Sequence, residues 1–67
     1  MAVIKVIEIL ANSAKSWEDA TQNAVIHASK TVRNIKGVNV GNMSAQVDGK
    51  GRITEYRVNV KLSFEVE

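Results

Sequence analysis

Side chains suited to metal or covalent chemistry are scarce in this 67-residue sequence. His27 is its only histidine, and it contains no cysteine. A metal site would therefore have to join this imidazole to carboxylates. On a helix, however, the positions three and four residues from His27 hold no carboxylate. A structural or surface role is therefore favoured for His27. Serines are plentiful, but no neighbouring base marks one as activated, so we predict that the protein is not an enzyme.

Two glycine-containing segments and one aromatic residue could contact a ligand. Gly37 to Gly41 and Asp48-Gly49-Lys50-Gly51 both lack the longer glycine-rich run, ending in Gly-Lys-Ser/Thr, that defines a phosphate-binding loop. The second segment is favoured as a hairpin turn. Trp17 could stack on a flat ligand, but its place on the apolar stripe of an expected helix favours a core position.

A row of polar side chains in the last third of the chain is the remaining candidate. It alternates with apolar residues, the pattern of a strand buried on one face. The polar row is Arg57, Asn59, Lys61, Ser63 and Glu65, and the apolar row is Tyr56, Val58, Val60, Leu62, Phe64 and Val66. The polar row is either a solvated face or, in a closed oligomer, the lining of an interior or a ligand slot. The sequence leaves both open.

Two elements are expected ahead of this strand. Residues 2–11 are rich in β-branched types and apolar on both alternating faces, which predicts a strand covered on both sides. Ser13 is a good N-cap for the helix that follows, and Ser16 is a competing one. No Gly or Pro occurs from Ala14 to Arg33, which predicts one amphipathic helix. Its buried stripe comprises Trp17, Ala20, Ala24, Ala28, Thr31 and Ile35.

The rest of the chain is expected to form a hairpin. Residues 38–47 alternate as a strand, but their phase slips at Gly41-Asn42, as a β-bulge would cause. The closing strand begins at about Arg52, with a second slip near Thr54-Glu55. A right-handed crossover makes the first strand parallel to the second, so the closing strand should lie between them. The predicted fold is α+β, with order β-α-β-β and a three-stranded antiparallel sheet against one helix.

Size and composition point to an assembly of such chains. A chain of 67 residues makes one domain, residues 1–67, with a marginal core. One helix cannot cover a sheet built on so long a closing strand, and the first strand is apolar on both faces, so we predict a tight homo-oligomer. The formal charge of +2 is evenly spread, which argues against nucleic-acid binding. Neither a signal peptide nor a membrane span is visible, and we expect a cytoplasmic protein.

The whole chain resembles the dodecins, a family of small bacterial and archaeal flavin-binding proteins. The resemblance rests on residues 5–9 (Lys-Val-Ile-Glu-Ile), Asn12-Ser13, residues 28–34 (Ala-Ser-Lys-Thr-Val-Arg-Asn) and the strand that begins Thr54-Glu55-Tyr56-Arg57-Val58. It implies a protomer whose sheet wraps around the helix. It also implies that copies assemble into a hollow homo-dodecamer, in agreement with the oligomer inferred above.

The resemblance also locates a ligand site. In flavin-binding dodecins, tryptophans of neighbouring subunits stack on paired flavins, and a glutamine of the last strand hydrogen-bonds the flavin ring. The tryptophan position corresponds to Gly37, or to Asn39 by the pattern of some relatives, and the glutamine position corresponds to Arg57. Both residue types are therefore replaced here. An acidic residue associated with cation binding falls at Asn42. Arg57 could stack on a ring or favour an anionic ligand.

The resemblance therefore implies a non-enzymatic binding or storage protein. Its pockets between subunits would hold a flavin (riboflavin or FMN) or a related anionic cofactor such as coenzyme A. The cofactor-binding residues expected are Gly37, Val38, Asn39 and Arg57, and no metal ligand is assigned. The alternative is a dodecin-like assembly that does not bind flavin and has a structural or ion-binding role.

Overall fold

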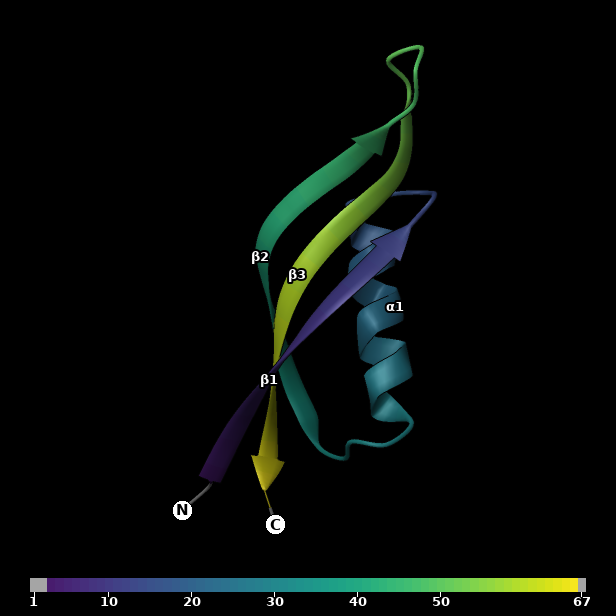
Figure 1. Ribbon diagram of the computed structural model, residues 1–67. Coiled ribbons are helices and arrows are strands. Elements are labelled where there is room, and N and C mark those ends of the chain that lie inside the picture. Colours follow the sequence, from purple (N-terminus) through teal and green to yellow (C-terminus); the bar gives the residue numbers. More distant parts are fainter. Residues whose placement is uncertain (1–2, 67) are drawn as a thin grey trace.

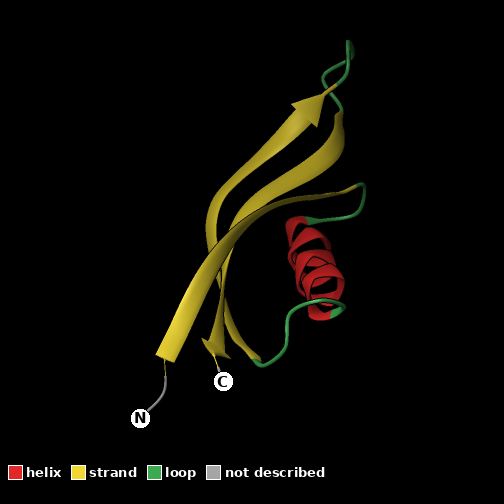
Figure 2. Cartoon of the chain, turned by 60° about the horizontal axis from the view of Figure 1, so that its bottom comes forward, coloured by secondary structure: helices red, strands yellow, loops and turns green. Residues whose placement is uncertain are grey.

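The computed structural model describes residues 3–66 and contains four elements in the predicted order. These are β1 (Val3–Ser13), α1 (Trp17–Ser29), β2 (Ile35–Val47) and β3 (Ile53–Val66) (Figure 1). The strands form one antiparallel sheet in the order β1-β3-β2, so the closing strand is central, as predicted. The sheet curves around α1, which lies against one of its faces (Figure 2).

Two of the three register shifts between β2 and β3 were predicted. Val40 pairs with Val60 and Met43 pairs with Val58, so Gly41 and Asn42 together face one residue of β3. The second shift leaves Thr54 as an extra residue on β3, because Glu55 pairs with Gln46 and Ile53 with Val47. Glycine suits the first bulge because a Cβ at Gly41 would lie 3.1 Å from the carbonyl oxygen of Asn59. A third shift, between Ile35 and Gly37, was not predicted.

The helix is shorter than the sequence suggested. It begins after Ser16, whose hydroxyl accepts a hydrogen bond from the backbone N–H of Asp19 at 2.9 Å. Ser13 instead ends β1 and donates to the Asp19 carboxylate at 2.6 Å, so Ser16 is the N-cap. At the other end Thr31 lies beyond the helix and is exposed, which corrects its assignment to the buried stripe. No helix within residues 3–66 is long and apolar enough to cross a membrane.

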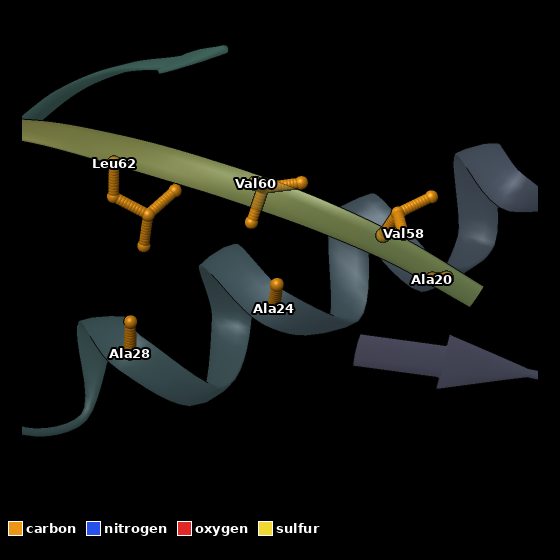
Figure 3. Close-up of a cluster of buried hydrophobic side chains, with 6 residues drawn as sticks. All are labelled: Ala20, Ala24, Ala28, Val58, Val60 and Leu62. Atoms are coloured by element: carbon orange, nitrogen blue, oxygen red, sulfur yellow. The ribbon is translucent and has the colours of Figure 1, made fainter. Parts of the chain in front are cut away.

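The core lies between α1 and the apolar face of β3. Ala20, Ala24 and Ala28 are buried on the helix and face Val58, Val60 and Leu62 on the strand (Figure 3). Small residues let the helix backbone approach the sheet closely, so the branched side chains of β3 fill the space between them. Partly buried residues surround this cluster: Ile7, Ile9, Ala11, Trp17, Val25 and Ile35.

Much apolar surface of the sheet is left uncovered by residues 3–66. On β1, the face with Ile7 and Ile9 packs toward the core, while Leu10 on the other face is 78% exposed. The covered second face predicted for this strand is therefore absent from the single chain. Other large apolar side chains on the strands are also exposed: Val3, Ile4, Val6, Val38, Val40, Met43, Val47, Ile53 and Val66. Exposed apolar surface of this extent is typical of an interaction site.

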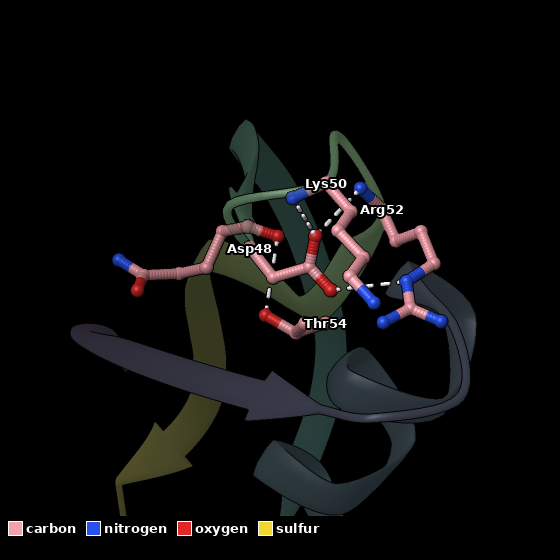
Figure 4. A network of polar contacts seen from close by, with 5 residues as sticks. Asp48, Lys50, Arg52 and Thr54 are labelled. Atoms are coloured by element: carbon pink, nitrogen blue, oxygen red, sulfur yellow. Dashed lines mark hydrogen bonds and ion pairs between the residues drawn. The ribbon is translucent and has the colours of Figure 1, made fainter.

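The β2–β3 hairpin turn is built around Asp48, as the sequence predicted. Oδ1 of Asp48 accepts from the backbone N–H groups of Lys50 at 2.8 Å and Arg52 at 3.0 Å (Figure 4). Oδ2 pairs with the Arg52 guanidinium at 3.1 Å. These bonds hold the pKa of the Asp48 carboxyl below its ordinary value, chiefly through the backbone N–H of Arg52. Gly51 adopts a positive φ of 80°, which suits glycine.

The tight contact between α1 and β3 makes Ala24 sensitive to added volume. We expect Ala24→Leu to lower the free energy of unfolding by about 1–3 kcal/mol, because the larger side chain overpacks the interface. Gln22→Leu, at an exposed position of the same helix, should change it by less than about 0.5 kcal/mol. Denaturant unfolding at one fixed protein concentration measures both. Equal effects of the two substitutions would contradict this packing.

The Asp48 turn should make stability depend on pH. Because the folded-state pKa is lowered, the ionised carboxylate stabilises the fold above the ordinary aspartate pKa, and this contribution is lost as the pH falls through the lowered value. Asp48→Asn should therefore lower the melting temperature at about pH 7 and have less effect at about pH 2.5. Thermal melts of both proteins across this range measure the difference. A constant difference at all pH values would argue against the charged turn.

Candidate ligand-binding site

The polar row of β3 lies on the face of the sheet opposite α1. Its position follows from the alternation of the strand, because Val58, Val60 and Leu62 point to the helix. The strand register places Asn12 of β1 on one side of Arg57 and Ser44 of β2 on the other. Polar side chains from all three strands therefore meet on the helix-free face.

At this place the sheet is hollowed, and we call the depression the polar hollow. Its volume is about 400 Å³. The bulge at Gly41-Asn42 adds the Asn42 side chain to it, beside residues that β1 and β3 contribute. It is lined by Leu10, Ala11, Asn12, Asn42, Ser44, Arg57, Val58 and Asn59.

Arg57 carries the only charge among the residues that line the polar hollow. Its Nε donates to Oε1 of Glu55 at 2.7 Å, and the side chains are 49% and 33% exposed. An ion pair this exposed adds little to stability, so its main effect is to orient the guanidinium. The remaining N–H groups of Arg57 make no hydrogen bond to any other residue in the range 3–66.

The other polar side chains of the hollow are also available. Within residues 3–66, the amides of Asn12, Asn42 and Asn59 and the hydroxyl of Ser44 make no side-chain hydrogen bond. The backbone oxygen of Ser44 accepts from Nε1 of Trp17 at 2.9 Å and leaves the hydroxyl uninvolved. The hollow therefore presents several hydrogen-bonding groups that solvent or a ligand can satisfy.

The expected cofactor-binding residues do not form one cluster within the chain. Gly37 pairs with Ser63 and Asn39 with Lys61, whereas Arg57 pairs with Ser44. Lys61 and Arg57 are four residues apart on β3, or roughly 13 Å along an extended strand. Val38, opposite Leu62, faces the helix side, away from Arg57. One chain brings Arg57 into the polar hollow and leaves residues 37–39 near the other end of the sheet.

The sequence reasoning missed most of the residues that surround Arg57. Asn12 and Ser44 are 45 and 13 positions away from it in the chain, and Asn59 was read only as a member of the polar row. A usable signal was nevertheless present. Once the closing strand is placed between the other two, counting the register from the hairpin turn and from the Gly41-Asn42 bulge puts Ser44 opposite Arg57.

Trp17 and Tyr56 do not offer a platform for a flavin ring. Trp17 and Tyr56 contact each other edge to face, with centroids 4.9 Å apart and planes at 79°. Tyr56 belongs to the apolar row, on the side of the sheet that faces the helix. Neither residues 37–39 nor the residues of the polar hollow include an aromatic side chain. Residues 37–39 and the polar hollow of one chain therefore do not fit stacking of the isoalloxazine ring.

A metal site does not fit within one chain either. Among residues 3–66, no group of three or more His, Cys, Asp or Glu side chains could hold an ion. Calcium favours carboxylate oxygens, and none lines the polar hollow. His27 lies exposed on α1, beside a shallow groove that Asn12 and Asn23 also line. Its surroundings supply amides and no second metal-binding imidazole or carboxylate.

Comparison with known proteins decides the family. Residues 3–67 match the model of the family described as Dodecin. The chain belongs to the dodecin family. Calcium dodecin of Mycobacterium tuberculosis is 39% identical over 66 residues, which cover 98% of this chain and 92% of that protein. Dodecins are small binding proteins, so family membership agrees with the prediction of a binding protein.

Solved dodecin structures have the same protomer fold. An alanine variant of the Thermus thermophilus dodecin has a TM-score of 0.92 at 28% identity, covering 100% of this chain and 98% of the other. Streptomyces coelicolor dodecin also has a TM-score of 0.92, at 29% identity, and the match covers 98% of this chain and 93% of the other. The M. tuberculosis calcium dodecin structure has a TM-score of 0.82 at 37% identity, and the match covers 97% of this chain and 91% of the other. It is described as having a novel calcium-binding site. The predicted fold is confirmed, and a dodecamer is consistent with these homologues.

Proposed function

We propose that this dodecin is a non-enzymatic protein that sequesters a small cofactor. Its copies form a hollow homo-dodecamer, with the whole chain as one domain, and the ligand lies in pockets between copies. The ligand is a flavin (riboflavin or FMN) or a related anionic cofactor such as coenzyme A. The partners are further copies of the chain and this ligand, and neither nucleic acid nor membrane is one. The expected location is the cytoplasm.

The proposal rests chiefly on the separation of the expected binding residues. Gly37 and Asn39 lie well away from Arg57 on the same face of the sheet. A pocket that contains both groups therefore needs two copies. The uncovered apolar surface supports the same arrangement. Leu10, for example, is 78% exposed, and its burial by a neighbouring copy would stabilise the assembly.

Within this proposal, the chemistry favours the anionic part of the ligand over the flavin ring. Stacking of a flat base on an aromatic side chain contributes roughly 1–3 kcal/mol, and Gly37 and Asn39 supply no such contact. Arg57, by contrast, supplies a permanent positive charge and several N–H donors. We therefore expect FMN or coenzyme A to bind more tightly than a neutral flavin does.

A second candidate function is supported by one relative. The 39% identical protein of M. tuberculosis is named a calcium dodecin, which favours an assembly that binds ions and no flavin. Within residues 3–66 no cluster of carboxylates is preassembled. A calcium site in this protein would therefore have to combine carboxylates from several copies.

Light scattering and ligand titration together test these functions. We expect the purified protein to have the mass of a dodecamer rather than the 7.3 kDa of one chain. Adding protein should quench FMN fluorescence, and calorimetry should detect coenzyme A binding. A monomeric mass would contradict the shell. If neither cofactor binds to an intact assembly and calcium does, the second function replaces the first.

Flavin binding should be strengthened by restoring the family residues. Gly37→Trp combined with Arg57→Gln should raise riboflavin affinity about tenfold or more, because it returns a stacking surface and a ring-binding amide. A Cβ at Gly37 would lie 3.1 Å from Oγ of Ser63. To relieve this contact, the tryptophan variant also carries Ser63→Ala, and the control protein carries the same substitution.

Asn39→Trp with Arg57→Gln tests the other possible place of the tryptophan in the same titration. Ser63→Ala alone serves as the control, since it changes the neighbouring side chain and adds no ring. If neither tryptophan variant binds riboflavin more tightly than this control, the assignment of the flavin site to residues 37–39 is wrong.

A further inference from the structure

We propose that the polar hollow binds the phosphate group of a phosphate monoester, with Arg57 supplying the charge. This inference rests on the proposed function, that the protein holds a small cofactor, and adds the group that is recognised and the residues that recognise it. The site lies around Arg57 within one chain, apart from residues 37–39.

The donors of the polar hollow suit an anion with several oxygens. Arg57 of β3 is paired with Asn12 of β1 on one side and with Ser44 of β2 on the other. Neighbouring strands are about 4.8 Å apart, so these side chains form a row across the sheet that is long enough to contact several oxygens of one phosphate group. Asn59 and Asn42 complete the lining. Phosphate oxygens accept hydrogen bonds from guanidinium, amide and hydroxyl groups, most strongly from guanidinium.

The charge of the polar hollow excludes a cation as its preferred ligand. Its lining includes one guanidinium and no carboxylate. Glu55 lies outside this lining, and its Oε1 accepts a hydrogen bond from Nε of Arg57 at 2.7 Å. This contact uses one N–H of the guanidinium and leaves its other N–H groups for a ligand. A phosphate monoester carries nearly two negative charges at neutral pH, which matches this arrangement.

The shape of the polar hollow suits an ester better than free phosphate. Its volume of about 400 Å³ exceeds the needs of one phosphate group, and Leu10, whose apolar side chain lies on the helix-free face beside Asn59, lines it. The organic part of a phosphate ester can lie against Leu10 while the phosphate contacts Arg57. Inorganic phosphate should therefore bind more weakly than an ester does.

Glu55 should weaken the site because its carboxylate competes with the ligand for Arg57. Both side chains are partly exposed, so the guanidinium can exchange one partner for the other. Replacing Glu55 by Gln removes a negative charge beside the phosphate and keeps a similar shape. We therefore expect phosphate-ester affinity to rise in this variant.

Calorimetric titration of the intact assembly with FMN, riboflavin, glycerol phosphate and inorganic phosphate tests the proposal. FMN and riboflavin share the ring and differ in the phosphate. We expect FMN to bind about tenfold or more tightly than riboflavin, and Arg57→Gln to remove this difference. Glu55→Gln should increase FMN affinity several-fold, and added salt should reduce it. Light scattering verifies that each variant keeps the assembly of the parent protein.

Lys61→Gln is the matched control, because Lys61 is a cation on the same face of β3 and lies outside the polar hollow. It removes the same charge as Arg57→Gln and should leave the difference between FMN and riboflavin in place. Equal losses in the two variants would show a general charge effect and overturn the proposal.

The other outcomes separate this inference from the proposed function. Equal binding of FMN and riboflavin would overturn the phosphate site and leave cofactor sequestration standing. Binding of glycerol phosphate as tight as that of FMN would support the site and remove the flavin ring from the function. Tighter binding of inorganic phosphate than of either ester would contradict the assignment to an ester. No binding of any of the four ligands to an intact assembly would overturn the phosphate site and the flavin part of the proposed function.

Discussion

The burial of one face of β3 against a short, alanine-rich helix is the constraint on which the rest of the structure depends. A helix of 13 residues is about 20 Å long, whereas a strand of 14 residues spans about 46 Å. The chain accordingly extends to 53 Å in its longest dimension and only 13 Å in its shortest. One helix therefore cannot cover this sheet, and the uncovered apolar side chains are consistent with the homo-oligomeric assembly of dodecin structures.

The strands were predictable because their pattern is local. The alternation from Tyr56 to Val66 identified the buried face of β3, and its interruption at Gly41-Asn42 located a bulge that the register confirms. The helix ends were less predictable. Ser13 and Ser16 offer the same capping chemistry, and only the contact of Ser13 with Asp19 across the β1–α1 connection decides between them. At the far end, Asn34 adopts a positive φ of 63°, which helical spacing in the sequence does not reveal.

The candidate site was less predictable than the fold because it depends on pairing between distant strands. Arg57 was recognised from its place in the closing strand, but Asn12 and Ser44 become its neighbours only through the two registers of the sheet. A change of one residue in either register would turn those side chains to the helix face. The resemblance to dodecins, in turn, grouped Gly37 and Asn39 with Arg57, although these residues are separated along the sheet of one chain.

The two faces of β3 separate the core from the candidate site. Val58, Val60 and Leu62 hold the helix, while Arg57 and Asn59 alternate with them and line the polar hollow. A substitution on the polar face therefore changes the lining of the hollow with little effect on the core, in keeping with a TM-score of 0.92 at 28% identity. Gly41 is the exception, because its close approach to Asn59 maintains the bulge that places Asn42 in the hollow. At this position the backbone geometry and the chemistry of the site cannot vary independently.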